Sequence, residues 1–247
     1  MSIVDELFED SEFDKKIVKS FQTKNHLSPK IFKNDILMPD VREHLLKISD
    51  KFIDHLGVKF FIYDIVLTGS LANYNWSEFS DVDLHILVDL SENSQYKDII
   101  KDFLDSKKNI WNSSHDIKIK GFEVELYVQD ISEKHLSSGV YSVLNNHWLI
   151  KPEKGKHSID ENQILSKGEE YAKIIDDLSE RSKGGENLTS EVDDIKDKIK
   201  RFRQCGLETG GEYSYENLTF KLLRRNGYIK KLLDIKKHST DNFLSVA

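Results

Sequence analysis

The chain has 247 residues, a formal net charge of −7 at pH 7 and a single cysteine, Cys205. This length suffices for one good hydrophobic core, or for one domain with a helical appendage. The single cysteine excludes an internal disulfide and a Cys/His zinc cluster. Because the sequence contains no apolar window long enough for a membrane span, and residues 1–10 lack the pattern of a signal peptide, we expect a cytoplasmic protein without a membrane partner.

The first elements along the chain are an arm and a helix. Apolar residues recur without a clean period over residues 1–37, which predicts an N-terminal arm docked on the body. A regular stripe then predicts an amphipathic helix that begins at an Asp40 N-cap and ends near Gly57; it consists of Val41, Leu45, Ile48, Phe52 and Leu56.

Two strands and the loop between them carry the functional signal. Residues 60–68 are apolar almost throughout, as in a central strand, and lead directly to Gly69 and Ser70. After residues 71–80 a second strand begins with Asp81 and Asp83, which alternate with apolar residues and therefore share one face. Carboxylates side by side repel unless a divalent cation such as Mg²⁺ compensates their charge. A glycine and a hydroxyl at a helix start can hold phosphate oxygens, although a chance turn followed by two solvated aspartates would look similar.

At these residues the sequence resembles the DNA polymerase beta-like nucleotidyltransferase superfamily, whose pattern is hydrophobic-Gly-Ser, a loop, and Asp-hydrophobic-Asp. The resemblance implies an α/β fold, a short mixed sheet flanked by helices, followed by a helical C-terminal domain. It also implies two Mg²⁺ ions, or Mn²⁺ in their place, held by Asp81, Asp83 and a third carboxylate. In one respect the sequence departs from many relatives, because residues 71–80 contain no Arg or Lys to neutralise a triphosphate.

The third carboxylate is expected on a neighbouring strand. After a helix predicted over residues 96–111, residues 122–128 alternate between apolar and polar positions, and both Glu123 and Glu125 have the parity of an acidic face. We favour Glu125, because it lies deeper in the strand, whereas Glu123 follows a break at Gly121. By resemblance this glutamate would bind metal and accept the proton of the attacking hydroxyl.

The rest of the chain predicts a hairpin and a helical domain. Residues 138–144 and 147–150 form the hairpin, and a polar stretch at residues 152–162 marks a boundary. We therefore expect an arm at 1–37, a catalytic domain at 38–152 and a helical domain at 158–247. Three helices are predicted in the last of these, the third beginning at a Ser214 cap and continuing through Leu233.

The third of these helices supplies the candidate cations for a triphosphate. Lys221, Arg224 and Arg225 lie away from its apolar stripe. Residues 196–237 hold twelve Lys/Arg against five Asp/Glu, so this part is basic while the rest of the chain is acidic. Such residues can equally form a solvated helix face.

Together with these features, the resemblance implies a magnesium-dependent nucleotidyltransferase. It would use a nucleoside triphosphate, ATP among them, release pyrophosphate and modify a hydroxyl on RNA, protein, a nucleotide or a small molecule. Two alternatives remain: a cyclic or linear oligonucleotide synthase of the same superfamily, and a non-catalytic member that binds nucleotide or nucleic acid. The arrangement, with Arg-Arg-Asn-Gly-Tyr in its last helix, is also similar to small nucleotidyltransferase-like proteins of large tailed phages. The base and the oligomeric state are left open.

Overall fold

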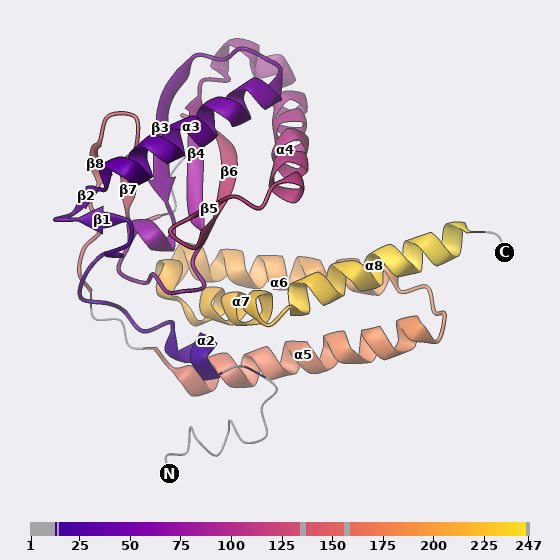
Figure 1. The fold of residues 1–247 in the computed structure, drawn as a ribbon. Coiled ribbons are helices and arrows are strands. Elements are labelled where there is room, and N and C mark those ends of the chain that lie inside the picture. The colour runs from indigo at the N-terminus through magenta and orange to yellow at the C-terminus, as the bar shows by residue number, and fades with distance from the viewer. Residues whose placement is uncertain (1–12, 14, 134–136, 156–158, 246–247) are drawn as a thin grey trace. The chain divides into compact units, whose positions relative to one another are not determined.

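A computed structural model describes residues 13, 15–133, 137–155 and 159–245 (Figure 1). The chain divides into two compact units. The sheet unit comprises residues 22–156, and the helical unit combines residues 1–21 with residues 157–247. The polypeptide therefore leaves the helical unit, builds the sheet unit and then returns.

A mixed sheet forms the centre of the sheet unit. Within the described residues it has six strands in the order β5-β6-β4-β3-β7-β8. Their bounds are β3 Ile62–Thr68, β4 Val82–Val88, β5 Lys118–Ile119, β6 Phe122–Asp130, β7 Val140–Ser142 and β8 His147–Ile150. β4 and β6 are parallel, whereas the other neighbours are antiparallel. The predicted α/β fold with a short mixed sheet is confirmed.

Two helices supply the other half of the core. α3 (Pro39–Leu56) and α4 (Lys97–Ser114) bury their apolar stripes in one cluster with alternate residues of the three central strands, such as Leu67, Leu84 and Leu126. α4 also bonds to β6: the Asn112 amide donates to Leu126 O and accepts from Leu126 N, both at 3.2 Å. One face of the sheet is thus apolar, and the polar residues of the same strands are left on the opposite face.

The start of α3 differs from the prediction. Pro39 is the first helical residue, and the N-cap position is Met38, whose thioether cannot do the work of a capping carboxylate. Asp40, predicted as the cap, instead accepts a 2.5 Å bond from Lys120 in the β5–β6 turn. Proline is favoured in the first turn because its missing N–H would have no intrahelical partner there. The predicted end at Gly57 is confirmed, with a left-handed φ of 73°.

Shorter elements complete the sheet unit. The turn η1 (Ser70–Ala72) follows β3, η2 (Ser91–Tyr96) precedes α4, and β1 (Phe32–Lys33) pairs with β2 (Ile36–Leu37). The hairpin predicted from residues 138–150 is present as β7 and β8.

The helical unit contains α2 (Lys15–Lys19), α5 (Glu161–Lys183), α6 (Thr189–Gly210), η3 (Gly211–Tyr213), α7 (Tyr215–Arg225) and α8 (Tyr228–Leu244). The Ser214 cap is confirmed, since its side chain accepts from Asn217 N. The prediction of one helix from Ser214 through Leu233 is wrong, because the chain breaks at Asn226 and Gly227, where Gly227 has a φ of 81°. Glycine adopts this left-handed conformation without the steric cost of a side chain.

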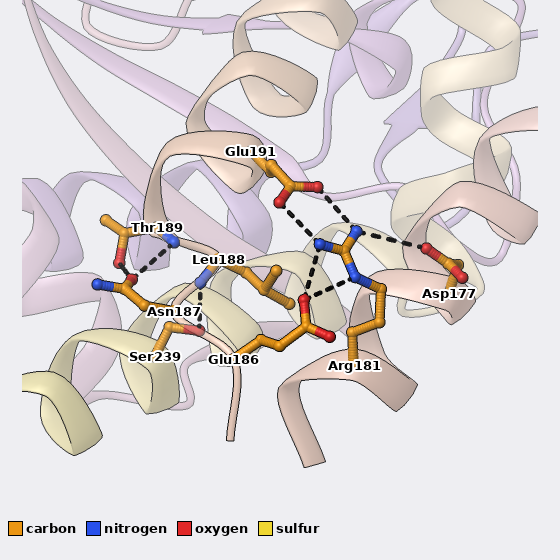
Figure 2. A network of polar contacts seen from close by, with 8 residues as sticks. All are labelled: Asp177, Arg181, Glu186, Asn187, Leu188, Thr189, Glu191 and Ser239. Atoms are coloured by element: carbon orange, nitrogen blue, oxygen red, sulfur yellow. Dashed lines mark hydrogen bonds and ion pairs between the residues drawn. The ribbon is translucent and has the colours of Figure 1, made fainter. Parts of the chain in front are cut away.

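An arginine-centred network joins α5 to α6 (Figure 2). The Arg181 guanidinium binds both oxygens of Glu191, at 2.8 Å each, and also binds Glu186 at 2.9 and 3.0 Å. Asp177 lies 3.7 Å from the same group. Beside the network, Leu188 N donates to Ser239 Oγ of α8 at 3.4 Å. The α5–α6 connection is therefore held by charge as well as by packing.

The residues predicted as one arm, 1–37, are shared between the two units. Phe13, Ile17, Val18 and Phe21 are buried in the helical unit. Residues 22–37 belong to the sheet unit, where Leu27, Ile31 and Phe32 enter the core beside β1 and β2. In the described part of the chain, no helix is long and apolar enough to cross a membrane.

Candidate active site

The polar face of the sheet carries the candidate carboxylates. In the parallel pair β4–β6, Asp83 lies opposite Glu125 and His85 lies opposite Tyr127. Their apolar neighbours Leu84 and Leu126 are fully buried on the other face. Because side chains alternate along each strand, Asp83 and Glu125 project from the same side of the sheet at the same level.

The end of β3 brings the predicted Gly-Ser turn against this pair. Thr68 pairs with Asp83, so Gly69 comes immediately after that level of the sheet. A Cβ on Gly69 would lie 1.8 Å from Asp83 Oδ2, and the residue has a φ of 70°. Both the space and the backbone conformation therefore require glycine. Gly69 therefore lies directly against Asp83, a proximity that was not predicted from the sequence.

Ser70 begins the short η1 turn and is half-buried. Its hydroxyl donates to Ser80 Oγ at 2.8 Å, and the same Ser80 oxygen accepts from Ser77 N at 2.9 Å. These bonds tie the start of the 71–80 loop to its end. Since a serine hydroxyl can rotate and also accept, Ser70 keeps the capacity to meet a phosphate oxygen.

Aromatic residues in this loop fix it to the body of the sheet unit. Tyr74 is buried in the core, and the Trp76 indole N–H donates to His26 O at 2.8 Å. Lys24 N in turn donates to Tyr74 O at 2.7 Å. The loop that carries Ser70 is thus anchored by the chain segment that enters the sheet unit.

The two glutamates of β6 have different surroundings. Glu123 pairs with Lys118 of the β5–β6 hairpin, with its charged atoms 3.7 Å apart, and 63% of its side chain is exposed. Glu125 is half-buried and accepts a hydrogen bond from the Tyr127 hydroxyl. Asp81, which is also half-buried, immediately precedes β4. Glu125 is the glutamate in register with Asp83.

The donor set of this face suits a hard cation such as Mg²⁺. No group of three or more His, Cys, Asp or Glu side chains is arranged to hold a metal ion among the described residues. Proteins usually bind Mg²⁺ through one or two carboxylates, with waters and substrate phosphates as the other ligands. The Asp83–Glu125 pair meets this smaller requirement, and Asp81 immediately precedes the strand that carries Asp83.

The predicted triphosphate cations lie on α7, in the helical unit, whereas the carboxylates belong to the sheet unit. Arg224 is exposed and Lys221 half-buried. Arg225 is engaged within its own unit: its guanidinium donates to Ser20 Oγ at 3.0 Å and lies 5.3 Å from the Phe21 ring centroid. Arg225 therefore holds the N-terminal segment, a role that the sequence analysis missed.

Two further residues on the polar face were not predicted. Tyr127 and His85 share the strand parity of Glu125 and Asp83, and their ring centroids are 4.9 Å apart. The alternation that selected the carboxylates contained this signal. Tyr127 and His85 were not predicted because only acidic residues were considered as site residues on these strands.

The fold and this face define an α/β protein with a carboxylate pair beside a Gly-Ser turn. The family model for the nucleotidyltransferase domain matches residues 41–202, and the chain belongs to this family, of the polymerase beta-like superfamily. The match begins in α3, includes every candidate carboxylate and extends into α6. No curated protein and no solved structure matches the chain significantly. The likeness to phage proteins gains no support from these comparisons.

Proposed function

We propose that the protein transfers a nucleoside monophosphate from a nucleoside triphosphate, such as ATP, to a hydroxyl acceptor, with release of pyrophosphate. The observation that carries this proposal is the register of Asp83 with Glu125 and the close approach of Gly69 to Asp83. Family membership supports a nucleotide substrate. A fixed carboxylate pair next to an accessible backbone is what phosphoryl chemistry needs, because its catalysis depends chiefly on positioning and charge compensation.

In this proposal Asp81, Asp83 and Glu125 hold the divalent metal, two Mg²⁺ ions or Mn²⁺. When bound, the metal would supply Lewis-acid stabilisation of charge on the phosphoryl oxygens. Glu125 is also the group proposed to accept the proton of the attacking hydroxyl, since a half-buried carboxylate on a strand can be held within reach of a bound acceptor. Gly69 admits the substrate phosphates to the backbone, and Ser70 offers its N–H and hydroxyl to them.

The positive charge that the 71–80 loop lacks would come from α7. Lys221, Arg224 and Arg225 are the proposed residues, and Arg225 also binds Ser20. Location in the cytoplasm and the identity of the acceptor stay predictions. An oligonucleotide synthase differs from the main proposal only in its acceptor, and a non-catalytic nucleotide-binding protein is the reading to exclude.

The test is incubation with labelled nucleoside triphosphates, each with and without Mg²⁺, followed by measurement of pyrophosphate. We expect magnesium-dependent pyrophosphate release that is lost in Asp83→Asn. A labelled oligonucleotide as the product would select the synthase. Nucleotide binding without pyrophosphate release, for all four bases and with candidate hydroxyl acceptors present, would contradict the transferase and favour the binding protein.

A further inference from the structure

Glu125 is the first member of a chain of side-chain contacts on the polar face. Tyr127 donates its hydroxyl proton to Glu125 Oε2. The ring of His85 lies against Tyr127, with centroids 4.9 Å apart, and His85 Nδ1–H donates to Gln129 Oε1 at 2.7 Å. Gln129 Nε2 then donates to Glu133 O at 3.3 Å. The contacts run continuously from the candidate catalytic carboxylate to Glu133, which follows β6.

The Tyr127 hydroxyl is held in place by its neighbours. His85 lies opposite Tyr127 in the parallel ladder, in the centre of the sheet, so the spacing of the two rings follows from the backbone. Lys108 of α4 approaches the Tyr127 ring to 5.1 Å from its centroid, within the range of a cation–π contact. A tyrosine has only two soft torsions before its hydroxyl, and these contacts restrict both.

A glutamate carboxylate is mobile by comparison, because three torsions separate it from the backbone. The hydrogen bond from Tyr127 fixes one of its oxygens and leaves the other available. Hydrogen-bond donors behind a metal-binding carboxylate orient it, and their loss typically weakens metal affinity or activity by about 10–100-fold.

We propose that Tyr127 is a positioning residue for metal binding: it fixes Glu125 Oε2 so that Oε1 is presented to the divalent cation. This inference rests on the proposed function, since it assigns Glu125 to the metal. Its competitor is a purely structural hydrogen bond that stabilises the sheet and has no effect on metal.

The sheet unit offers a matched control for that competitor. Tyr141 is almost fully buried, its hydroxyl accepts from Leu37 N at 3.3 Å and donates to Asn146 Oδ1 at 3.0 Å, and its ring lies in the apolar core. Tyr141→Phe therefore removes hydroxyl bonds of the same kind without touching the polar face.

The experiment measures Mn²⁺ binding to the full chain by electron paramagnetic resonance, without nucleotide, alongside melting temperatures in chelator. We expect Tyr127→Phe to weaken Mn²⁺ affinity about tenfold or more, and Tyr141→Phe to leave it unchanged while lowering the melting temperature at least as much. In a double-mutant cycle, Tyr127→Phe should cause no further loss in a Glu125→Gln background, because the tyrosine acts through that carboxylate.

Unchanged Mn²⁺ affinity in Tyr127→Phe, or additive losses in the cycle, would overturn the inference alone. The proposed function would still stand if the parent binds Mn²⁺ and releases pyrophosphate. A parent that binds no Mn²⁺ and releases no pyrophosphate would remove both.

Discussion

Gly69 belongs to the Gly-Ser motif of the sequence, and the space beside Asp83 also requires a glycine at this position. Gly69→Ala would place a methyl group 1.8 Å from Asp83 Oδ2 at a left-handed φ. We expect a loss of about 2 kcal/mol or more in the free energy of unfolding, together with loss of nucleotidyl transfer, because Asp83 must move. Thermal melts and pyrophosphate release check this expectation.

Gly57→Ala is the control for the cost of placing a side chain on a residue with a left-handed backbone conformation. Gly57 has a φ of 73°, and a Cβ there would meet nothing within 4 Å among the described residues. The cost should stay near 1 kcal/mol, with activity retained. Equal losses in the two variants would mean that the contact with Asp83 contributes nothing.

The two glutamates of β6 provide the second residue-scale prediction. Glu125→Gln should reduce nucleotidyl transfer by about a hundredfold or more, whereas Glu123→Gln should retain most of it, because only Glu125 is in register with Asp83. Steady-state rates at saturating triphosphate and Mg²⁺ decide between them. The reverse order would reassign the third carboxylate to Glu123, and two small effects would argue against a three-carboxylate site.

At this scale the sequence was informative about faces and uninformative about registers. Alternation alone placed Asp83 and both glutamates on polar faces, because it depends only on local geometry. Choosing Glu125 over Glu123 on geometric grounds requires the β4–β6 register, which pairs residues distant in the chain. The bond between Arg225 and Ser20 joins residues 205 positions apart, and no periodic pattern in the sequence indicates it.

Among the elements, α7 has two arginines with different predicted roles. Arg225→Glu should lower the free energy of unfolding by about 2 kcal/mol, since it removes a bond to Ser20 and a contact with Phe21. Arg224→Glu should leave stability within about 0.5 kcal/mol, because the side chain is exposed. Chemical denaturation measures both effects.

Arg224→Glu is then the clean test of triphosphate binding by α7. We expect calorimetry to show weaker triphosphate affinity in this variant, because an arginine-phosphate contact supplies charge that the 71–80 loop lacks. An affinity equal to that of the parent would identify this part of α7 as a solvated face. The same assay on Arg225→Glu is less informative, as its fold is perturbed.

The corner between α5 and α6 should respond to pH. The hydrogen bond from Arg181 lowers the pKa of Glu191 below its ordinary value of 4.5. A carboxyl whose folded pKa is depressed stabilises the fold above its unfolded pKa, and this contribution is lost as the pH falls through the folded value. Arg181→Met should therefore melt below the parent at pH 7, and the difference should shrink as the pH falls from 5 to 3. A difference independent of pH would assign the effect to packing, not charge.

The α7–α8 break shows how an apolar pattern can mislead. Apolar spacing continues across Asn226 and Gly227, and the prediction followed it into a single helix. The turn signal was present in the same residues, because glycine is common where a helix ends in a left-handed conformation. Here the helix-ending residues Asn226 and Gly227 indicate the structure better than the apolar periodicity does.

For the whole molecule, the two units predict a localised effect of truncation. Removing residues 1–21 takes Phe13, Ile17, Val18 and Phe21 out of the helical unit, and fully burying each such side chain is worth about 1.5–3 kcal/mol. Hydrogen exchange should then accelerate in α5, α7 and α8 and change little in β3, β4 and β6. Faster exchange throughout both units would show instead that they unfold as one.

The interrupted course of the chain also bears on the order of events at the ribosome. Residues 22–156 make up the sheet unit, so all of its chain is synthesised before α5 to α8 are translated. Phe13, Ile17 and Val18 are made before the sheet unit, whereas the rest of the helical unit, which includes the Tyr228 ring that contacts Phe13, is made after it. Until then these side chains remain exposed on the nascent chain, and exposed apolar surface favours aggregation or chaperone binding. This N-terminal part of the helical unit is thus buried only after residues 157–247 have been made.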